Sequence, residues 1–380
     1  MKILVVKETH PAETRTALIP ADVDKLIKKG AEITVESGLG ERAGYPDADY
    51  RKAGAGISED RQKDLAATDI IVRIRKPDLG EVDTWKQGVV HISYLDPFNN
   101  LELVNKMASA GMSAISLEMV PRITRAQKMD ALSSQASIAG YNAVLLAAGR
   151  LPKVFPMMMT PAGTISPSRI FVIGAGVAGL QAIATAKRLG ARVEAFDTRP
   201  VVEEQVKSLG AKFVKVDLGE TGQTKDGYAK ALTEEQIQKQ REVMAKHCAL
   251  ADVVITTAQL FGRKAPLIIT GDMVKKMRPG SLIVDMAVES GGNVEGSRCG
   301  EIVEQNGVAI MGLENLAGKT PYHASQMLSA NFFNLLEDSW DPESKSYAIK
   351  TEDEILKGCL ITHKGGIVNE VIKDLTTGEN

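Results

Sequence analysis

The sequence lacks three features that would assign the chain to a protein class at once: clustered cysteines, an excess of one charge, and long apolar segments. Its three cysteines, Cys248, Cys299 and Cys359, lie far apart, which argues against a disulfide framework and a cysteine metal site and indicates a reducing compartment. Lys+Arg 46 against Asp+Glu 48 leaves a net charge of −2, so the basic excess expected of a nucleic-acid-binding protein is missing.

No apolar segment approaches the roughly 18 residues that a membrane-spanning helix needs. Residues 1–8 read as a first β-strand and not as a signal peptide. Hydrophobic residues at 44% and charged residues at 25% exclude intrinsic disorder, and 380 residues exceed the ~100–200 of one ordinary domain. The sequence therefore indicates a soluble, cytoplasmic protein of two or three domains with no direct membrane span.

What the sequence does contain is a regular alternation. Glycine and proline separate short β-branched segments from segments of helical length, a pattern typical of βα units and parallel sheets. Strands are expected at residues 2–6, 32–36, 70–74, 89–94 and 113–117, and then at 170–173, 192–196, 212–216, 252–256, 281–285 and 308–311. Helices are expected at residues 20–29, 133–149 and 233–246 and after Pro321.

This alternation predicts an α/β fold of two doubly wound parallel-sheet (Rossmann-like) domains, joined by long helices with a cleft between them. The first domain is expected to be discontinuous, at 1–132 plus 326–380, and the second to cover 133–325. A polar insertion at about 218–250 interrupts the second domain, as functional or mobile segments do. Ala136, Ala139, Gly140 and Ala143 share one face of the 133–149 helix, which predicts close packing against another helix.

The strongest local signal is the segment 169–180, in which an apolar strand leads directly into G-x-G-x-x-G and then into a helix. Gly174 permits the tight turn, Gly176 lets a pyrophosphate approach the backbone, and Gly179 lets helix and strand pack closely. No second complete fingerprint occurs in the sequence. The second domain is therefore expected to be a Rossmann domain that binds one dinucleotide, although a βαβ turn without a ligand stays an alternative.

Asp197 ends the next predicted strand, close to the position ~20 residues on at which the fingerprint places an acid. A carboxylate there accepts hydrogen bonds from the hydroxyls of the adenosine ribose and repels a 2′-phosphate, which favours NAD(H) over NADP(H). Arg199, two residues later, is the type of residue that accommodates a 2′-phosphate. The carboxylate at the strand tip carries more weight.

Other polar segments leave two interpretations open. Residues 121–133 offer an arginine, an amide, a carboxylate and a hydroxyl, and such a segment is either a catalytic loop or a solvated loop capped by Ser133. Arg15 either binds an anion or belongs to a charged loop. Asp285 and Glu289 suit either the rim of a nucleotide site or a turn. The five histidines show no metal spacing, so no metal is expected, and the three methionines at 157–159 predict an adaptable packing surface.

Residues 7–20, 174–179 and 277–292 together resemble the superfamily of alanine dehydrogenase and nicotinamide nucleotide transhydrogenase. Residues 118–135, 139–141 and 155–160 are most similar to the NAD(H)-binding component, domain I or the alpha-1 subunit, of proton-translocating transhydrogenases. The resemblance covers nearly the whole chain. It implies a homodimer that binds NAD(H), with NADP(H) held by partner membrane subunits that place the chain at the inner face of the plasma membrane.

The resemblance also implies the site residues. In this family a loop supplies an arginine, a glutamine and an aspartate that hold the nicotinamide end, which gives catalytic roles to Arg122, Gln127 and Asp130. The further cofactor-binding residues that it implies are Ile123, Thr124, Ser133, Gly174, Ala175, Gly176, Val177, Gly179, Asp197, Thr198, Arg199, Gly227, Gln240 and Gln259. The insertion around Gly227 and Tyr228 is similar to the family's mobile loop.

The two branches of the superfamily differ in chemistry. Alanine dehydrogenase needs a general acid, a histidine in that family, and this position falls on Asp96, with Arg75 replacing a substrate-binding lysine and Glu289 replacing a second acid. Hydride transfer between two nicotinamides needs no proton, only oriented rings and excluded water. We therefore expect a Si–Re-specific, proton-translocating transhydrogenase subunit, ahead of a stand-alone alanine dehydrogenase-like enzyme and of an NAD-sensing module.

Overall fold

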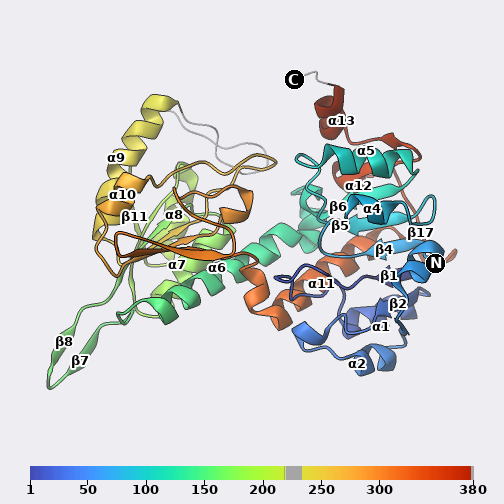
Figure 1. Cartoon of the computed structure of the whole chain (residues 1–380), viewed down its shortest axis with the longest axis horizontal. Helices are drawn as coiled ribbons and strands as arrows, with labels where there is room; N and C mark the ends of the chain where they lie inside the picture. Colours follow the sequence, from blue (N-terminus) through green and yellow to red (C-terminus); the bar gives the residue numbers. More distant parts are fainter. Residues whose placement is uncertain (218, 220–232, 378–380) are drawn as a thin grey trace. The chain divides into compact units, whose positions relative to one another are not determined.

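The computed structural model describes residues 1–217, 219 and 233–377. The chain forms two compact units, unit 1 (Met1–Gln135 and Thr320–Asn380) and unit 2 (Ala136–Lys319), both drawn in Figure 1. In the described part of the chain, no helix combines the length and the apolar character that crossing a membrane requires.

Unit 1 is built on an eight-stranded sheet in the order β19-β18-β6-β5-β4-β1-β2-β3. The strands from β3 to β6 in this order pair in parallel, and β18 and β19 add an antiparallel edge. The strands are β1 (Lys2–Val5), β2 (Glu32–Glu36), β3 (Gly56–Ser58), β4 (Ile70–Val72), β5 (Val90–Ser93), β6 (Ser113–Ser116), β18 (Leu360–His363) and β19 (Gly366–Ile367), with a separate pair β16 (Trp340–Asp341) and β17 (Ser346–Tyr347). The strand order reverses between β1 and β4, the type of switch point at which open α/β sheets bind ligands.

Helices cover both faces of this sheet, because its central strands are apolar on both sides. Ile3 and Val5 of β1 pack into one core and Leu4 and Val6 into the other. The helices of unit 1 are α1 (Pro20–Lys28), α2 (Asp47–Lys52), α3 (Arg61–Ala67), α4 (Leu79–Val82), α5 (Leu101–Ser109), α11 (Pro321–Asp338), α12 (Glu354–Cys359) and α13 (Glu370–Thr377). Helix α6 (Ala131–Arg150) begins in unit 1 and continues into unit 2.

Unit 2 has a seven-stranded sheet in the order β11-β10-β9-β12-β13-β15-β14, parallel except for the edge strand β14. Its strands are β9 (Arg169–Ile173), β10 (Arg192–Phe196), β11 (Lys212–Phe213), β12 (Val253–Thr256), β13 (Leu282–Asp285), β14 (Glu301–Gln305) and β15 (Val308–Gly312). The strand order reverses between β9 and β12, so the switch point lies directly after β9.

Alternation along β9 again separates two cores. Ile170 and Val172 pack with helices α6, α7 (Val177–Arg188) and α8 (Glu203–Ser208), whereas Phe171 and Ile173 pack with α9 (Glu234–Leu250) and α10 (Gly271–Lys275). The predicted fold class is therefore confirmed: both units are doubly wound, Rossmann-like sheets with helices on both faces.

A two-stranded hairpin, β7 (Met158–Thr160) and β8 (Gly163–Ile165), projects from the rest of unit 2 (Figure 1). Met157 and Met159 are 60% and 73% exposed. The expectation that the three methionines pack within the chain is therefore wrong, because β7 pairs only with β8 and lies outside both cores of the unit.

Candidate nucleotide-binding site

Two glycines of the turn after β9 are required by the fold of unit 2 itself. Gly174 has φ +99, in the left-handed region that favours glycine, and its N–H donates to the Phe196 carbonyl at 2.8 Å. A Cβ at Gly179 would lie 1.9 Å from the Gly174 carbonyl oxygen. These two positions make the tight turn and let α7 pack against β9, as the sequence predicted.

Gly176 is different, because nothing in the chain crowds it. A Cβ there would meet only Arg199 Nη2, at 4.0 Å, and its φ of −79 suits any residue. Gly176 is the N-cap of α7, and no side chain of the described residues caps this helix. An uncapped helix N-terminus offers backbone N–H groups and a positive dipole end to an anion. The open space beside Gly176 and the uncapped N–H groups therefore fit a pyrophosphate.

Helix α6 holds this turn in place through its small residues. A Cβ at Gly140 would lie 2.2 Å from the carbonyl oxygen of Ala178, in the first turn of α7. Only glycine permits this contact, so the expectation that the small face of α6 packs closely on another helix is confirmed. The first turn of α7 is thereby supported from behind by a rigid helix.

Asp197, directly after β10, connects the turn to the neighbouring strand. Its Oδ2 accepts the N–H of Ala175 at 2.7 Å, and its Oδ1 accepts the backbone N–H of Arg199 at 2.8 Å. The Arg199 guanidinium pairs with both oxygens, Nε to Oδ1 at 2.9 Å and Nη2 to Oδ2 at 2.8 Å. The structure thus brings the predicted ribose acid, the glycine turn and the predicted arginine together.

Two residues that the sequence analysis did not assign build the other side of the switch point. Thr257, directly after β12, donates from Oγ1 to the Gly174 carbonyl at 3.1 Å. Asn293 is fully buried, and its Nδ2 donates to the carbonyls of Ala258 and Pro266, both at 2.8 Å. The only available signal for Thr257 was its place directly after a strand at the switch point.

Asp285 was left open between a site rim and a turn, and the structure assigns it to a turn. It is fully buried and accepts the N–H groups of Ala287, at 3.1 Å, and of Asn293, at 3.0 Å from Oδ2. Glu289 accepts the N–H of Asn315 at 3.1 Å. Both carboxylates therefore organise backbone in the loop after β13.

The remaining predicted residues of unit 2 lie on separate elements. Val177 is 45% exposed at the start of α7, and Thr198 lies between Asp197 and Arg199. Gln240 is buried on the same face of α9 as Met244 and Cys248. Gln259 is exposed, with Nε2 at 3.4 Å from the Met286 carbonyl. Gly227 and Tyr228 lie outside the described residues.

The other predicted residues belong to unit 1 and surround a 3-10 helix, Thr124–Met129, that precedes α6. Ala126 and Met129 are buried in the core of unit 1. Arg125 Nη2 donates to both Asp353 oxygens at 2.5 Å, and Asn331 Nδ2 donates to the Lys128 carbonyl at 2.9 Å. These contacts anchor the segment to α11 and α12.

The anchored segment leaves its polar side chains available. Arg122, Thr124 and Gln127 are exposed, and Ile123 is half-buried. Asp130 accepts the backbone N–H and the Oγ–H of Ser133, at 2.8 and 2.6 Å, as an N-cap residue does. The open question of whether Ser133 caps α6 is thus answered: Asp130 is the cap, and Ser133 is its donor.

Beside this segment, unit 1 carries a buried cluster of opposite charges. The Glu13 side chain is fully buried and binds Arg15 in a bidentate pair, with Nε–Oε1 2.8 Å and Nη2–Oε2 2.7 Å. Arg75 Nε lies 3.3 Å from Glu13 Oε2, and Arg15 Nη1 donates to Gln135 Oε1 at 2.9 Å. The two arginines lower the pKa of Glu13 to about 2 against the opposing effect of burial. Arg15 thus pairs with an anion that the chain itself supplies.

Two acid–base candidates of unit 1 are not placed for proton transfer. Asp96, with φ +48, lies in a turn where its carboxylate accepts from Asn99 and Asn100 at 2.8 and 2.9 Å. His91 is fully buried, stacked on Trp85 with ring centroids 4.9 Å apart, and Nε2 lies 2.9 Å from Ser93 Oγ. Burial holds the pKa of His91 well below its ordinary value, so this imidazole stays neutral.

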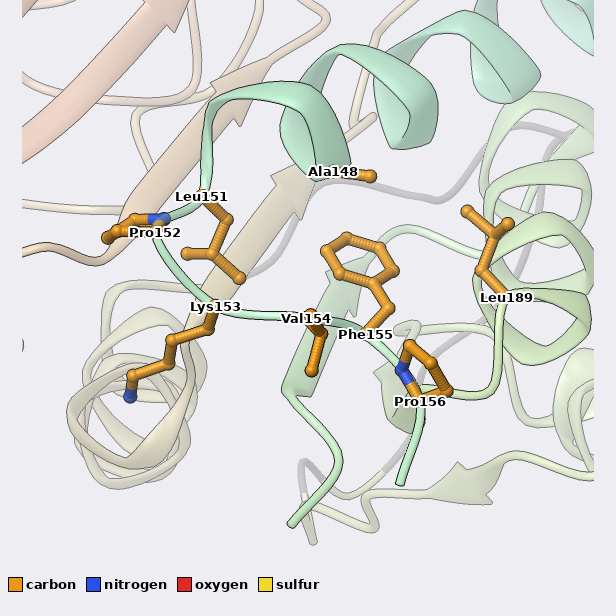
Figure 2. A pocket seen from close by; sticks show the side chains of 8 residues that line it. All are labelled: Ala148, Leu151, Pro152, Lys153, Val154, Phe155, Pro156 and Leu189. Atoms are coloured by element: carbon orange, nitrogen blue, oxygen red, sulfur yellow. The ribbon is translucent and has the colours of Figure 1, made fainter. Parts of the chain in front are cut away.

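A pocket of about 540 Å³ in unit 2 lies away from the predicted site residues (Figure 2). It is lined by apolar side chains at the end of α6 and the base of the β7–β8 hairpin, and Leu189 of the α7 C-terminus closes one side. Figure 2 shows Phe155 in its centre. None of the predicted nucleotide-binding residues lines it.

Comparison with known proteins gives matches over nearly the whole chain. The N-terminal domain family of alanine dehydrogenase/PNT matches residues 4–139, and the C-terminal domain family matches residues 143–370. The first of the separately encoded parts of NAD(P) transhydrogenase subunit alpha from Rhodospirillum rubrum is 42% identical over 98% of this chain and 99% of that protein.

A crystal structure of transhydrogenase from Sinorhizobium meliloti superimposes with a TM-score of 0.84 at 41% identity, covering 98% of this chain and 100% of that chain. Alanine dehydrogenase 1 of Staphylococcus aureus is 27% identical over 97% of this chain and 95% of that protein. The similarity is therefore stronger on the transhydrogenase side of the family.

Proposed function

The chain belongs to the alanine dehydrogenase/PNT family, and from this premise we propose that it is the NAD(H)-binding subunit of a proton-translocating transhydrogenase. In this proposal NADH bound to this chain passes its hydride, with Si–Re specificity, to an NADP⁺ that a partner subunit holds. The identity to a Rhodospirillum rubrum protein named as a piece of NAD(P) transhydrogenase subunit alpha supports the transhydrogenase role.

One observation favours hydride transfer between nucleotides over a stand-alone amino-acid dehydrogenase: unit 1 positions no general acid at the family's histidine position. Asp96 is occupied by Asn99 and Asn100, and His91 is sealed in the core and neutral. Reduction of an imine or a ketone needs a proton donor, whereas transfer between two nicotinamides does not. The residues present therefore fit the transfer that needs only orientation and dryness.

NAD(H) fits the residues of unit 2. The space beside Gly176 and the uncapped N-terminus of α7 suit the pyrophosphate, and Asp197 suits the ribose hydroxyls. When bound, the nicotinamide supplies the hydride at its C4. Arg122 and Gln127, exposed on an anchored segment, and Asp130 beside them are proposed to hold and orient the nicotinamide end.

The second nucleotide is assigned to another polypeptide. The chain contains one complete G-x-G-x-x-G fingerprint, and the carboxylate of Asp197 disfavours a 2′-phosphate. The designation of the relatives as subunits supports partner chains. We assign proton movement to a membrane partner, which would hold this chain at the cytoplasmic face.

The proposal includes a homodimer, which the β7–β8 hairpin supports. Met159 is 73% exposed, and a two-stranded hairpin alone is at best marginally stable in water. The apolar pocket at the hairpin base, lined by Leu151, Phe155 and Leu189, could receive the hairpin of a second copy (Figure 2), and two-fold symmetry makes both contacts at once. Met159→Lys should weaken the dimer at least about tenfold in sedimentation equilibrium. An unchanged dimer would contradict this arrangement.

Reconstitution tests the proposed function directly. Purified chain is added to membranes that carry the partner subunits but lack this one, and reduction of thio-NADP⁺ by NADH is followed. The proposal expects turnover that needs both components. Oxidation of NADH by pyruvate and ammonia with the chain alone would instead establish an amino-acid dehydrogenase, and NADH binding without partner-dependent turnover would indicate a sensing module.

A further inference from the structure

The carboxylate that ends β10 is already fully used by the chain. Asp197 Oδ1 accepts from the Arg199 backbone N–H at 2.8 Å and from Arg199 Nε at 2.9 Å. Its Oδ2 accepts from Arg199 Nη2 and from the Ala175 N–H, at 2.8 and 2.7 Å. The side chains of Asp197 and Arg199 are 6% and 15% exposed, respectively. A bidentate, largely buried arginine–carboxylate pair has defined geometry and is stronger than an exposed pair.

The guanidinium of this pair lies where a nucleotide would pass. Arg199 Nη2 is 4.0 Å from the position of a Cβ on Gly176, the open position of the turn. Asp197 in turn bonds the backbone of Ala175 in the same turn. A ligand whose pyrophosphate lies on α7 and whose ribose reaches Asp197 therefore meets Arg199 as well.

Two adenosine nucleotides would experience this pair differently. An unmodified ribose offers hydroxyl donors, which can share the Asp197 oxygens with Arg199. A 2′-phosphate offers only negative charge at neutral pH, so it meets the carboxylate first and the guanidinium is already neutralised. Arginine at this position is otherwise the residue type that accepts a 2′-phosphate.

We propose that Asp197 shields Arg199, and that the chain thereby contains a latent binding site for 2′-phosphorylated adenosine nucleotides, closed by one carboxylate. Asp197 then sets coenzyme selectivity in two ways: it binds the ribose of NAD(H), and it keeps the arginine beside it from binding the 2′-phosphate of NADP(H). This inference rests on the proposed function in one respect, because it assumes that the adenosine ribose binds at Asp197.

Isothermal titration of the full chain with 2′,5′-ADP and with NADH tests the site. Asp197→Ser removes the carboxylate and is expected to raise the affinity for 2′,5′-ADP at least about tenfold, because charge-assisted hydrogen bonds from Arg199 become available to the phosphate. The double variant Asp197→Ser with Arg199→Ala should lose this gain. Arg192→Ala in the Asp197→Ser background is the matched control, since Arg192 is exposed at the opposite end of β10, and it should keep the gain.

Asp197→Asn provides a second test with less disturbance of the fold. It is neutral and isosteric, and its amide oxygen can still accept the Ala175 N–H. It should show the same order of effects, with a smaller gain, if the serine variant is unstable. No gain in either variant overturns the inference, as does a gain that persists without Arg199 or disappears equally without Arg192. Failure of the wild-type chain to bind NADH would count against the proposed function instead.

Discussion

Units 1 and 2 share the doubly wound strand order but treat the switch point in opposite ways. In unit 2, β9 leads into a turn in which Gly176 faces open space and the following helix has no side-chain cap. In unit 1, the equivalent edge is filled from within. Glu8 Oε1 accepts the N–H groups of Ile74 and Arg75, at 2.6 and 3.1 Å, and Glu13 pairs with Arg75.

The difference shows how one architecture yields a ligand site in one copy and a filled edge in the other. Backbone N–H groups at the carboxyl ends of parallel strands need an acceptor. A carboxylate of the chain supplies it in unit 1, whereas in unit 2 we propose that the pyrophosphate of the nucleotide does. The side chains directly after the strands, and not the fold, therefore decide which edge binds a ligand.

The largest expected effect comes from removing the anion that fills unit 1. Glu13→Gln leaves two buried arginines without their carboxylate and should lower the free energy of unfolding by about 3 kcal/mol at neutral pH. Urea unfolding measures this loss. Glu32→Gln is the control, since Glu32 is exposed and its pair is expected to contribute less than about 1 kcal/mol. Equal, small effects would contradict the view that Glu13 holds the cluster together.

The same variant makes a prediction about pH. The folded-state pKa of Glu13, about 2, lies below its ordinary value of 4.5, so its stabilisation is fully present above pH 4.5 and is lost as the pH falls toward 2. The wild type should therefore approach the stability of Glu13→Gln over this range. Burial raises the pKa of Glu8 and of Glu118, which acts in the opposite direction in both proteins and cancels in the difference.

The next effect separates the glycines that the fold needs from the glycine that the ligand needs. Gly179→Ala places a methyl group against the Gly174 carbonyl and should cost up to about 3 kcal/mol of stability. Gly176→Ala should cost less than about 1 kcal/mol yet weaken NADH binding about tenfold by obstructing the approach to the backbone. Denaturation and calorimetric titration of both variants check this. Unchanged NADH affinity in Gly176→Ala would place the pyrophosphate elsewhere.

The smallest expected effect concerns the exposed loop of unit 1. Gln127→Ala should leave NADH affinity within a few-fold but lower reconstituted hydride transfer roughly ten- to a hundred-fold, because small misplacement of reacting atoms is costly. Lys128→Ala, on the same 3-10 helix, is the matched control and should change neither quantity. A parallel loss of binding and rate in Gln127→Ala would contradict a positioning role.

Much of the fold could be predicted from the sequence. Each predicted strand is present, and the strand 192–196 has its predicted bounds, because buried parallel strands are short apolar segments with clear glycine and proline limits. The strands that were not predicted are β3, β14, β18, β19 and the β7–β8 and β16–β17 pairs. Each lies at a sheet edge or outside the main sheets, or, for β18, in the antiparallel margin of its sheet, where burial leaves a weaker pattern in the sequence.

The candidate site was less predictable. The glycine turn and Asp197 follow from local spacing alone, and the structure brings them within hydrogen-bond distance. Thr257 and Asn293 gave no local signal beyond their place in the chain, since their roles depend on partners that lie far away in the sequence. The hairpin methionines were misjudged for a related reason: the sequence records that they are apolar but not whether another segment covers them.

By itself, the sequence determined which segments are strands and helices, where the glycine turn lies and which residue types follow each strand, because these properties depend on neighbours along the chain. Only the tertiary structure decided that Asp197 is paired with Arg199, that Asp285 holds a turn and that Glu13 neutralises two arginines. These outcomes depend on distances of about 3 Å between charged and polar atoms. Folding sets such distances, and sequence spacing does not specify them.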